Sequence, residues 1–101
     1  MKAKTKNGFE INVDDRKVKD WEYVEAVLDI ETAAENNDQL NMIRGIRFAA
    51  PKLLGEKGVK ALKDYLRKDD VVDTEEYITT FFEIIRLLGD KVKKSESSSS
   101  T

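Results

Sequence analysis

The chain has 101 residues and a mass of 11.5 kDa, the size of a single domain, and 38% of its residues are charged. It has no cysteine and no histidine, which excludes disulfides, thiolate nucleophiles, imidazole bases and zinc sites built on either residue. A net charge of -2 argues against a chain that binds polyanions along its whole length. We therefore expect a protein that is not an enzyme and holds no cofactor.

The N-terminal residues predict a short strand. Phe9, Ile11 and Val13 alternate with polar residues, which is the pattern of a strand with one buried face. Asn7-Gly8 is typical of hairpin turns, so residues 2–6 are the candidate second strand of a hairpin arm. For the domain organisation we expect 1–7 to be a flexible basic N-terminus. No apolar stretch follows it, so no secretory signal is predicted.

A first helix is expected to begin between Asp15 and Asp20 and to run to about Ala34. Its apolar residues predict a buried side made of Trp21, Val24, Val27 and Leu28. The residues 36–38 that follow, Asn-Asn-Asp, predict a turn and the cap of the next helix.

The second helix is expected to bury one apolar arc, composed of Leu40, Ile43, Ile46, Ala50, Leu53 and Leu54. Pro51 lies inside this arc, so the helix either kinks there or starts a new turn. Gly55-Glu56-Lys57-Gly58 ends the helix, and a third helix follows over 59–66. The same four residues resemble the GxxG loop of KH domains, but the flanking strands of that fold are missing, so a helix break is the preferred interpretation.

The fourth helix has a capping residue, Asp73, three positions before Glu76, and Gly89 is a candidate C-terminal cap. Its apolar stripe is about 160° wide at 100° per residue, which is too wide for one neighbour. Either this helix is central in the bundle, which we favour, or part of the stripe meets another subunit or a client. The candidate partner-binding residues are Phe81, Phe82, Ile84 and Leu87.

The predicted fold is thus mainly α, a small bundle of about four helices with a short N-terminal strand or hairpin arm. A single helical domain covers 8–89. Residues 90–101 are rich in Lys and Ser and predict a disordered tail. No stretch is apolar enough over the roughly 20 residues that cross a bilayer, so no membrane segment is expected.

Charge is segregated along the chain, since 9–38 has ten acids against three bases and 39–68 has eight bases against two acids. The favoured interpretation is that neighbouring helices neutralise each other, and the alternative is a nucleic-acid-binding regulator that uses the basic segment 44–68. Three acidic clusters lack the pattern of a calcium loop, so no metal site is predicted: Asp14-Asp15, Asp69-Asp70-Asp73 and Glu75-Glu76.

These features together resemble the tail assembly chaperones of long-tailed, siphophage-type phages. The matching residues are Phe9-Glu10-Ile11-Asn12-Val13-Asp14, Asp20-Trp21, Leu53-Leu54-Gly55, the capped aromatic-rich last helix and the Lys93-Lys94-Ser95 end. The resemblance implies a viral protein of the host cytoplasm, absent from the mature virion, that coats the long, helical and aggregation-prone tape measure protein before the tail polymerises.

The resemblance also implies partners other than the tape measure protein. These are the tail tube protein, further copies of the chain itself, and a longer form made by a programmed frameshift, for which Lys93-Lys94 is the candidate slippery position. Nucleic acid and membrane are not expected partners. Such a chaperone needs exposed apolar surface and no active site.

Overall fold

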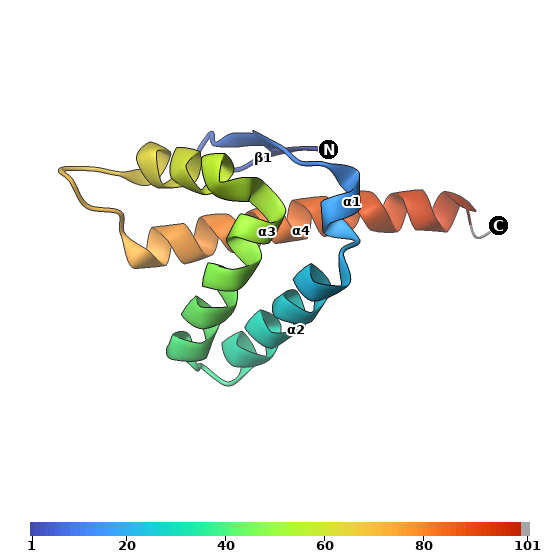
Figure 1. Cartoon of the computed structure of the whole chain (residues 1–101), viewed down its shortest axis with the longest axis horizontal. Helices are drawn as coiled ribbons and strands as arrows, with labels where there is room; N and C mark the ends of the chain where they lie inside the picture. The colour runs from blue at the N-terminus through green and yellow to red at the C-terminus, as the bar shows by residue number, and fades with distance from the viewer. Residues whose placement is uncertain (100–101) are drawn as a thin grey trace.

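The computed structural model describes the backbone of residues 1–99 and the side chains of residues 1–91. Its elements are a two-stranded hairpin and four helices (Figure 1): β1 (Lys2–Lys4), β2 (Glu10–Asn12), α1 (Asp15–Val18), α2 (Trp21–Glu35), α3 (Gln39–Leu66) and α4 (Thr74–Ser99). This confirms the predicted mainly helical fold with an N-terminal hairpin. Within the described residues, no helix has the length and hydropathy needed to cross a membrane.

The N-terminal hairpin packs onto the helices. β1 and β2 are antiparallel, with Ala3 opposite Ile11, and the turn between them contains Gly8 at a φ of 93°. Ala3 and Thr5 are buried, and the backbone N–H of Thr5 donates to the carbonyl of Phe9 at 2.9 Å. Residues 2–4 are therefore the second strand that the turn dipeptide predicts. The expected boundary at residue 8, with a flexible 1–7, does not agree with this packing.

Helix α2 buries a different side from the one its large apolar residues predict. The start is expected between Asp15 and Asp20; the structure has the short helix α1 there, and α2 follows with Asp20 as its N-cap, whose carboxylate accepts from the backbone N–H of Tyr23 at 2.9 Å. Trp21 and Leu28, expected inside, are 71% and 57% exposed. The buried side consists of Tyr23, Ala26, Ile30 and Ala33.

Close approach to α3 explains this rotation of α2. A Cβ atom added to Gly45 of α3 would lie 2.5 Å from Cγ1 of Ile30, so this glycine leaves room for the Ile30 side chain. Ala26 and Ala33 let the two backbones come near each other on the same side of α2. These small residues therefore determine which side of α2 packs against α3. They allow Ile30 to pack more closely than the large side chains of the predicted side would allow.

Helix α3 changes direction at Gly55, which has a φ of 74° and a ψ of 171°. The part before Gly55 lies along α2, and the part after it lies along α4 (Figure 1). Pro51 lies inside the first part, and Gly55 is the residue of α3 with a non-helical backbone. Of the two alternatives for Pro51, a new turn starting there is therefore wrong. Leu40, expected in the buried arc, is 60% exposed.

Helix α4 supplies much of the core. Its first turn is capped as predicted, because the Asp73 carboxylate accepts from the backbone N–H of Glu76 at 2.9 Å. Phe81, Ile84 and Leu88 are fully buried and meet other fully buried residues, namely Ile30, Leu53 and Leu62. The helix continues past Gly89, so the predicted cap at this residue is wrong. The predicted disordered tail falls largely outside the described side chains, and residues 100–101 lie outside the description altogether.

An ion-pair cluster joins the acidic α2 to the basic α3. The Lys52 ammonium lies 2.7 Å from a carboxylate oxygen of Glu22 and 3.4 Å from one of Asp20. The pKa of Asp20 is lowered, first by its hydrogen bond from the Tyr23 N–H and also by Lys52. This contact supports the interpretation that the alternating charge blocks neutralise each other between helices.

A first prediction concerns the direction change in α3. Gly55→Ala is expected to lower the free energy of unfolding by about 1–3 kcal/mol, because this backbone conformation is essentially restricted to glycine. A Cβ at Gly55 would meet no atom of other residues beyond its chain neighbours within 4 Å, so the cost is local backbone strain. Gly89→Ala is the matched control, since it also meets no atom but lies in a helix, and it should stabilise the protein by up to about 1 kcal/mol. Urea unfolding followed by circular dichroism measures both, and equal effects would contradict the prediction.

A second prediction concerns acid stability. The pKa values of Asp14, Asp20 and Asp64 are lowered, that of Asp14 to about 2 by hydrogen bonds from Arg16. Because these pKa values lie below those of the unfolded chain, their stabilisation is present above about pH 3.9 and is lost as the pH falls towards the folded-state values.

Asp20→Asn keeps an N-cap acceptor but cannot titrate, so its melting temperature should fall less than that of the unmodified chain between about pH 5 and pH 2. The control is Asp29→Asn, on the same helix, because Asp29 is exposed and forms no ion pair with residues 1–91. Its pH profile should match that of the unmodified chain. Identical profiles for all three proteins would show that the Asp20 contact does not contribute to the pH dependence of the melting temperature.

Candidate functional site

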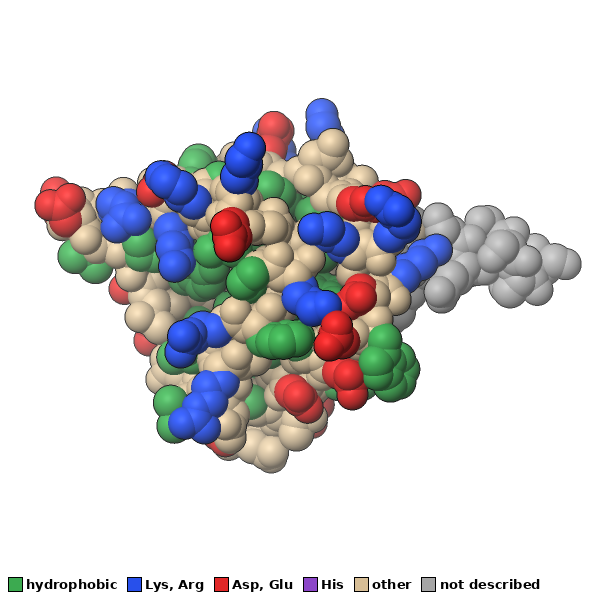
Figure 2. Space-filling view, in the orientation of Figure 1, with side chains coloured by type: hydrophobic (Ala, Val, Ile, Leu, Met, Phe, Trp, Pro, Cys, Tyr) green, Lys and Arg blue, Asp and Glu red, His purple; other side chains and the backbone are tan. Residues whose placement is uncertain are grey.

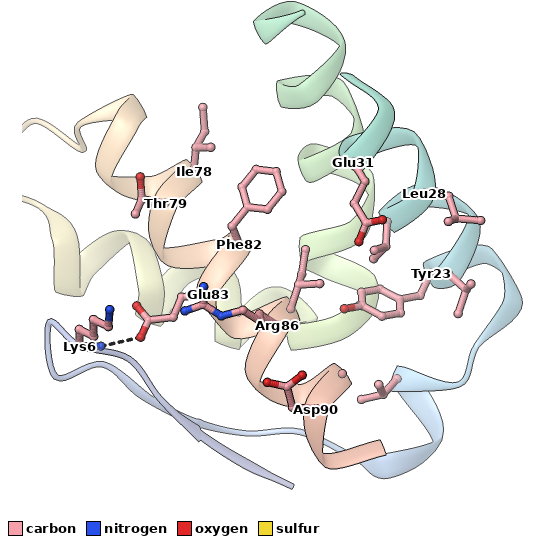
Figure 3. Close-up of a pocket in the computed structure, with 15 residues that line it drawn as sticks. Lys6, Tyr23, Leu28, Glu31, Ile78, Thr79, Phe82, Glu83, Arg86 and Asp90 are labelled. Carbon is pink, nitrogen blue, oxygen red and sulfur yellow. Dashed lines mark hydrogen bonds between the residues drawn. The ribbon is translucent and has the colours of Figure 1, made fainter. Parts of the chain in front are cut away.

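An open groove of about 880 Å³ lies between α2 and α4. Both helices present apolar side chains to it, and Figure 3 shows Phe82 reaching from α4 towards α2. Its apolar lining comprises Val24, Val27 and Leu28 of α2 with Ile78, Phe82 and Ile85 of α4. We name this feature the α2–α4 groove.

Charged side chains border the α2–α4 groove. Glu31 lies on the α2 side, whereas Glu83, Arg86 and Asp90 lie on the α4 side (Figure 3). The backbone N–H of Lys6, in the hairpin turn, donates to Oε2 of Glu83 at 2.9 Å and joins the hairpin to this wall. An apolar floor with a charged border is typical of grooves that take one face of an amphipathic helix.

Tyr23 marks where the groove meets the core. The residue lines the groove, yet it is buried, and this burial raises its pKa to about 12. Figure 3 shows its ring directed from α2 towards α4. The hydroxyl is therefore neutral at physiological pH, so the inner end of the groove carries no charge from this residue.

The four partner-binding residues that the sequence predicts fall into different places. Phe81 and Ile84 are fully buried in the core, so they have no surface to offer a partner. Phe82 lines the α2–α4 groove, and Leu87 packs partly buried against the core outside the groove lining. Of the four, Phe82 is the residue that the structure brings to the candidate site.

Sequence reasoning missed the α2 half of the groove. Val24, Val27 and Leu28 are predicted on the buried side of the first helix; Val24 and Val27 are half-buried against the core and Leu28 is exposed, and all three also line the groove. A signal was present in the sequence, because α2 has a second apolar side that contains Tyr23 and Ile30. A helix with two apolar sides needs two neighbours, or leaves one side open.

The basic segment 44–68 is partly neutralised. Lys60 and Arg67 pair with Asp64 at 2.8 and 3.4 Å, and Lys52 pairs with α2. Figure 2 shows Lys and Arg side chains gathered over α3 on the face in view. Five bases of the segment form no ion pair with residues 1–91: Arg44, Arg47, Lys57, Lys63 and Lys68.

The GxxG-like residues form part of the α3 direction change. A Cβ added to Gly58 would lie 2.7 Å from Cβ of Leu54 and 3.6 Å from Cδ1 of Ile11, so this glycine is needed for packing. The sheet of the described chain is the two-stranded hairpin β1–β2, which precedes both parts of α3. The predicted helix break is therefore confirmed. In residues 1–91, no group of three acids is placed to hold a metal ion.

Comparisons of the chain with protein-family models, with curated proteins and with solved structures give no match.

A third prediction separates the core side of α4 from its groove side. Phe81→Ala should lower the free energy of unfolding by about 3–5 kcal/mol, because it leaves a cavity in a close-packed core. Phe82→Ala should cost no more than about 1.5 kcal/mol, because its side chain already meets the open groove. Chemical denaturation of the two variants measures the difference, and a larger loss for Phe82→Ala would contradict the assignment of the two sides.

Proposed function

We propose that this protein is a non-enzymatic phage tail assembly chaperone that binds the tape measure protein in the host cytoplasm. The observation that carries the proposal is the α2–α4 groove, an open apolar surface on a small charged domain. The resemblance in layout to tail assembly chaperones supplies the identity of the client. A groove of this kind supports temporary coverage of another chain, which needs apolar surface and no reactive side chain.

The client segment that fits this groove is an amphipathic helix. Helix α2 has 15 residues and is therefore about 22 Å long, which corresponds to about four turns of a helix lying beside it. Client side chains spaced i, i+3, i+4 and i+7 would contact Val24, Leu28 and Phe82. The charges of Glu31 and Arg86 on opposite borders would orient the client and limit the segments that bind.

Many copies would act together in this function. Each copy covers one short segment, so a long client needs stoichiometric rather than catalytic amounts of the protein. We include the tail tube protein in the proposal as the factor that displaces the copies. A longer frameshifted form with the same domain would carry the same groove.

A fourth prediction tests client binding. The chain is co-expressed with tagged fragments of the tape measure protein, and the amount that co-purifies is compared among variants. Phe82→Asp and Leu28→Asp should each weaken binding at least about tenfold, because each places a charge in the apolar floor. Leu40→Asp is the matched control for Leu28→Asp, since Leu40 is 60% exposed against 57% for Leu28 but lies outside the groove lining. Far-UV circular dichroism should be unchanged in all three.

Two outcomes would contradict the proposal. One is co-purification that is unchanged in both groove variants. The other is a tight complex with single-stranded RNA or duplex DNA whose affinity falls steeply with salt, which would favour the nucleic-acid-binding regulator. We retain this second candidate function because five bases of the segment 44–68 form no ion pair with residues 1–91. Substitution of Arg47 and Lys63 by Glu would then abolish that complex.

A further inference from the structure

A second hollow lies in the angle between the two parts of α3, with the start of α4 as its third side (Figure 1). Its volume is about 310 Å³, which is at the lower end of the range for ligand-binding pockets. The floor is apolar, because Ile46 and Ala50 are buried there, and Val59 and Tyr77 form half-buried walls. We name this feature the α3–α4 pocket.

Two local features of the backbone shape the α3–α4 pocket. The direction change at Gly55 sets the two parts of α3 at an angle, so that both contribute lining residues. Before α4 the chain reverses in a tight turn. Residues 69–70, both Asp, have φ values of 51° and 65°, and the backbone N–H groups of Lys68 and Val71 donate to each other's carbonyls at 2.8 and 2.9 Å. This turn brings Val72 into the pocket wall, so the pocket is formed before a ligand arrives.

The charged side chains that line the α3–α4 pocket have one sign. Arg47 and Lys63 are exposed and form no ion pair with residues 1–91, and no acidic side chain belongs to the lining. They lie eight residues before and after Gly55, each about 12 Å along its part of α3, so the two cations lie on different walls. The Asp73 carboxylate, close by in sequence, accepts from the backbone N–H of Glu76 and lies outside the lining.

We propose that the α3–α4 pocket binds an acidic peptide segment of a partner protein, with one large apolar side chain on the floor and a carboxylate on either side of it. The apolar floor requires an apolar side chain, because water gains little there. The two cations require anions, and a carboxylate matches the guanidinium of Arg47 with two parallel hydrogen bonds. Because Arg47 and Lys63 lie on different walls, one carboxylate on each side of the apolar side chain satisfies both. Thr74 and Tyr77 add hydroxyl groups that can bond to the peptide backbone.

Charge complementarity favours a peptide over nucleic acid at this pocket. Three further bases of 44–68 without an ion pair to residues 1–91 lie outside the pocket lining: Arg44, Lys57 and Lys68. A phosphate backbone gains affinity from every base that it reaches, whereas the peptide needs only the two bases beside the apolar floor. The pocket shares Ile78 alone with the lining of the α2–α4 groove, so this proposal does not rest on the proposed function.

A fifth prediction tests peptide binding with the purified full-length chain. The probe is a synthetic peptide, Glu-Glu-Ala-Phe-Ala-Glu-Glu, added in an NMR titration of the isotopically labelled protein. We expect a dissociation constant below about 100 micromolar, with amide shifts concentrated at the lining residues of the α3–α4 pocket. A peptide with Ala in place of Phe, and one with Lys in place of Glu, should each bind at least about tenfold more weakly. Equal binding of the Ala peptide would overturn the proposal, because charge alone would then suffice.

Variants separate the pocket from the other surfaces. Arg47→Glu and Lys63→Glu should each weaken peptide binding at least about tenfold. Arg44→Glu and Lys57→Glu are the matched controls, one on each part of α3, because both bases also lack an ion pair to residues 1–91 but lie outside the lining, and both should leave binding unchanged. Equal weakening by the controls would overturn the proposal and favour a general basic surface. Leu28→Asp should leave peptide binding unchanged, so loss of client binding alone overturns only the proposed function, and loss of peptide binding alone overturns only the pocket.

Discussion

The direction change at Gly55 is the constraint on which the rest of the structure depends. A straight helix over the 28 residues of α3 would be about 42 Å long and would leave one half without a neighbour. At Gly55 the chain adopts a φ of 74° and a ψ of 171°, a conformation that side chains exclude. One part of α3 can therefore pack along α2 and the other along α4. The buried residues Leu53 and Leu62, one on each side of the break, then meet in a single core.

The contact between α2 and α3 decides what α2 shows to solvent. Ile30 packs at Gly45, where a larger residue would leave no space for it. This contact turns Tyr23 and Ala26 inwards and leaves Trp21 and Leu28 outside. The open apolar surface is thus a consequence of tight packing on the opposite side of the same helix. Lys52 reinforces the orientation through its ion pairs with Asp20 and Glu22.

The wide apolar stripe of α4 is divided between two purposes. Phe81, Ile84 and Leu88 fill the core, and the neighbouring side chains of Ile78, Phe82 and Ile85 line the groove. Helix α4 therefore contributes both to the stability of the bundle and to the shape of the exposed surface. The two interpretations of the stripe, a central helix and a partner surface, are compatible because they concern adjacent sides. The absence of cysteine and histidine agrees with a proposed function that depends on surface contact alone.

The sequence by itself determined most of the elements and the starts of the three long helices, because these depend on local interactions, whereas the end expected for α4 at Gly89 was wrong. Asp20, Asp38 and Asp73 each accept a hydrogen bond from the backbone N–H of the third residue of the helix that follows. Asn7-Gly8 and Gly55 likewise mark a turn and a break through their own backbone preferences. Only the tertiary structure decided which side of each helix is buried. A helix such as α2, with two apolar sides, has no local reason to prefer either, and the space beside Gly45 on another helix made the choice.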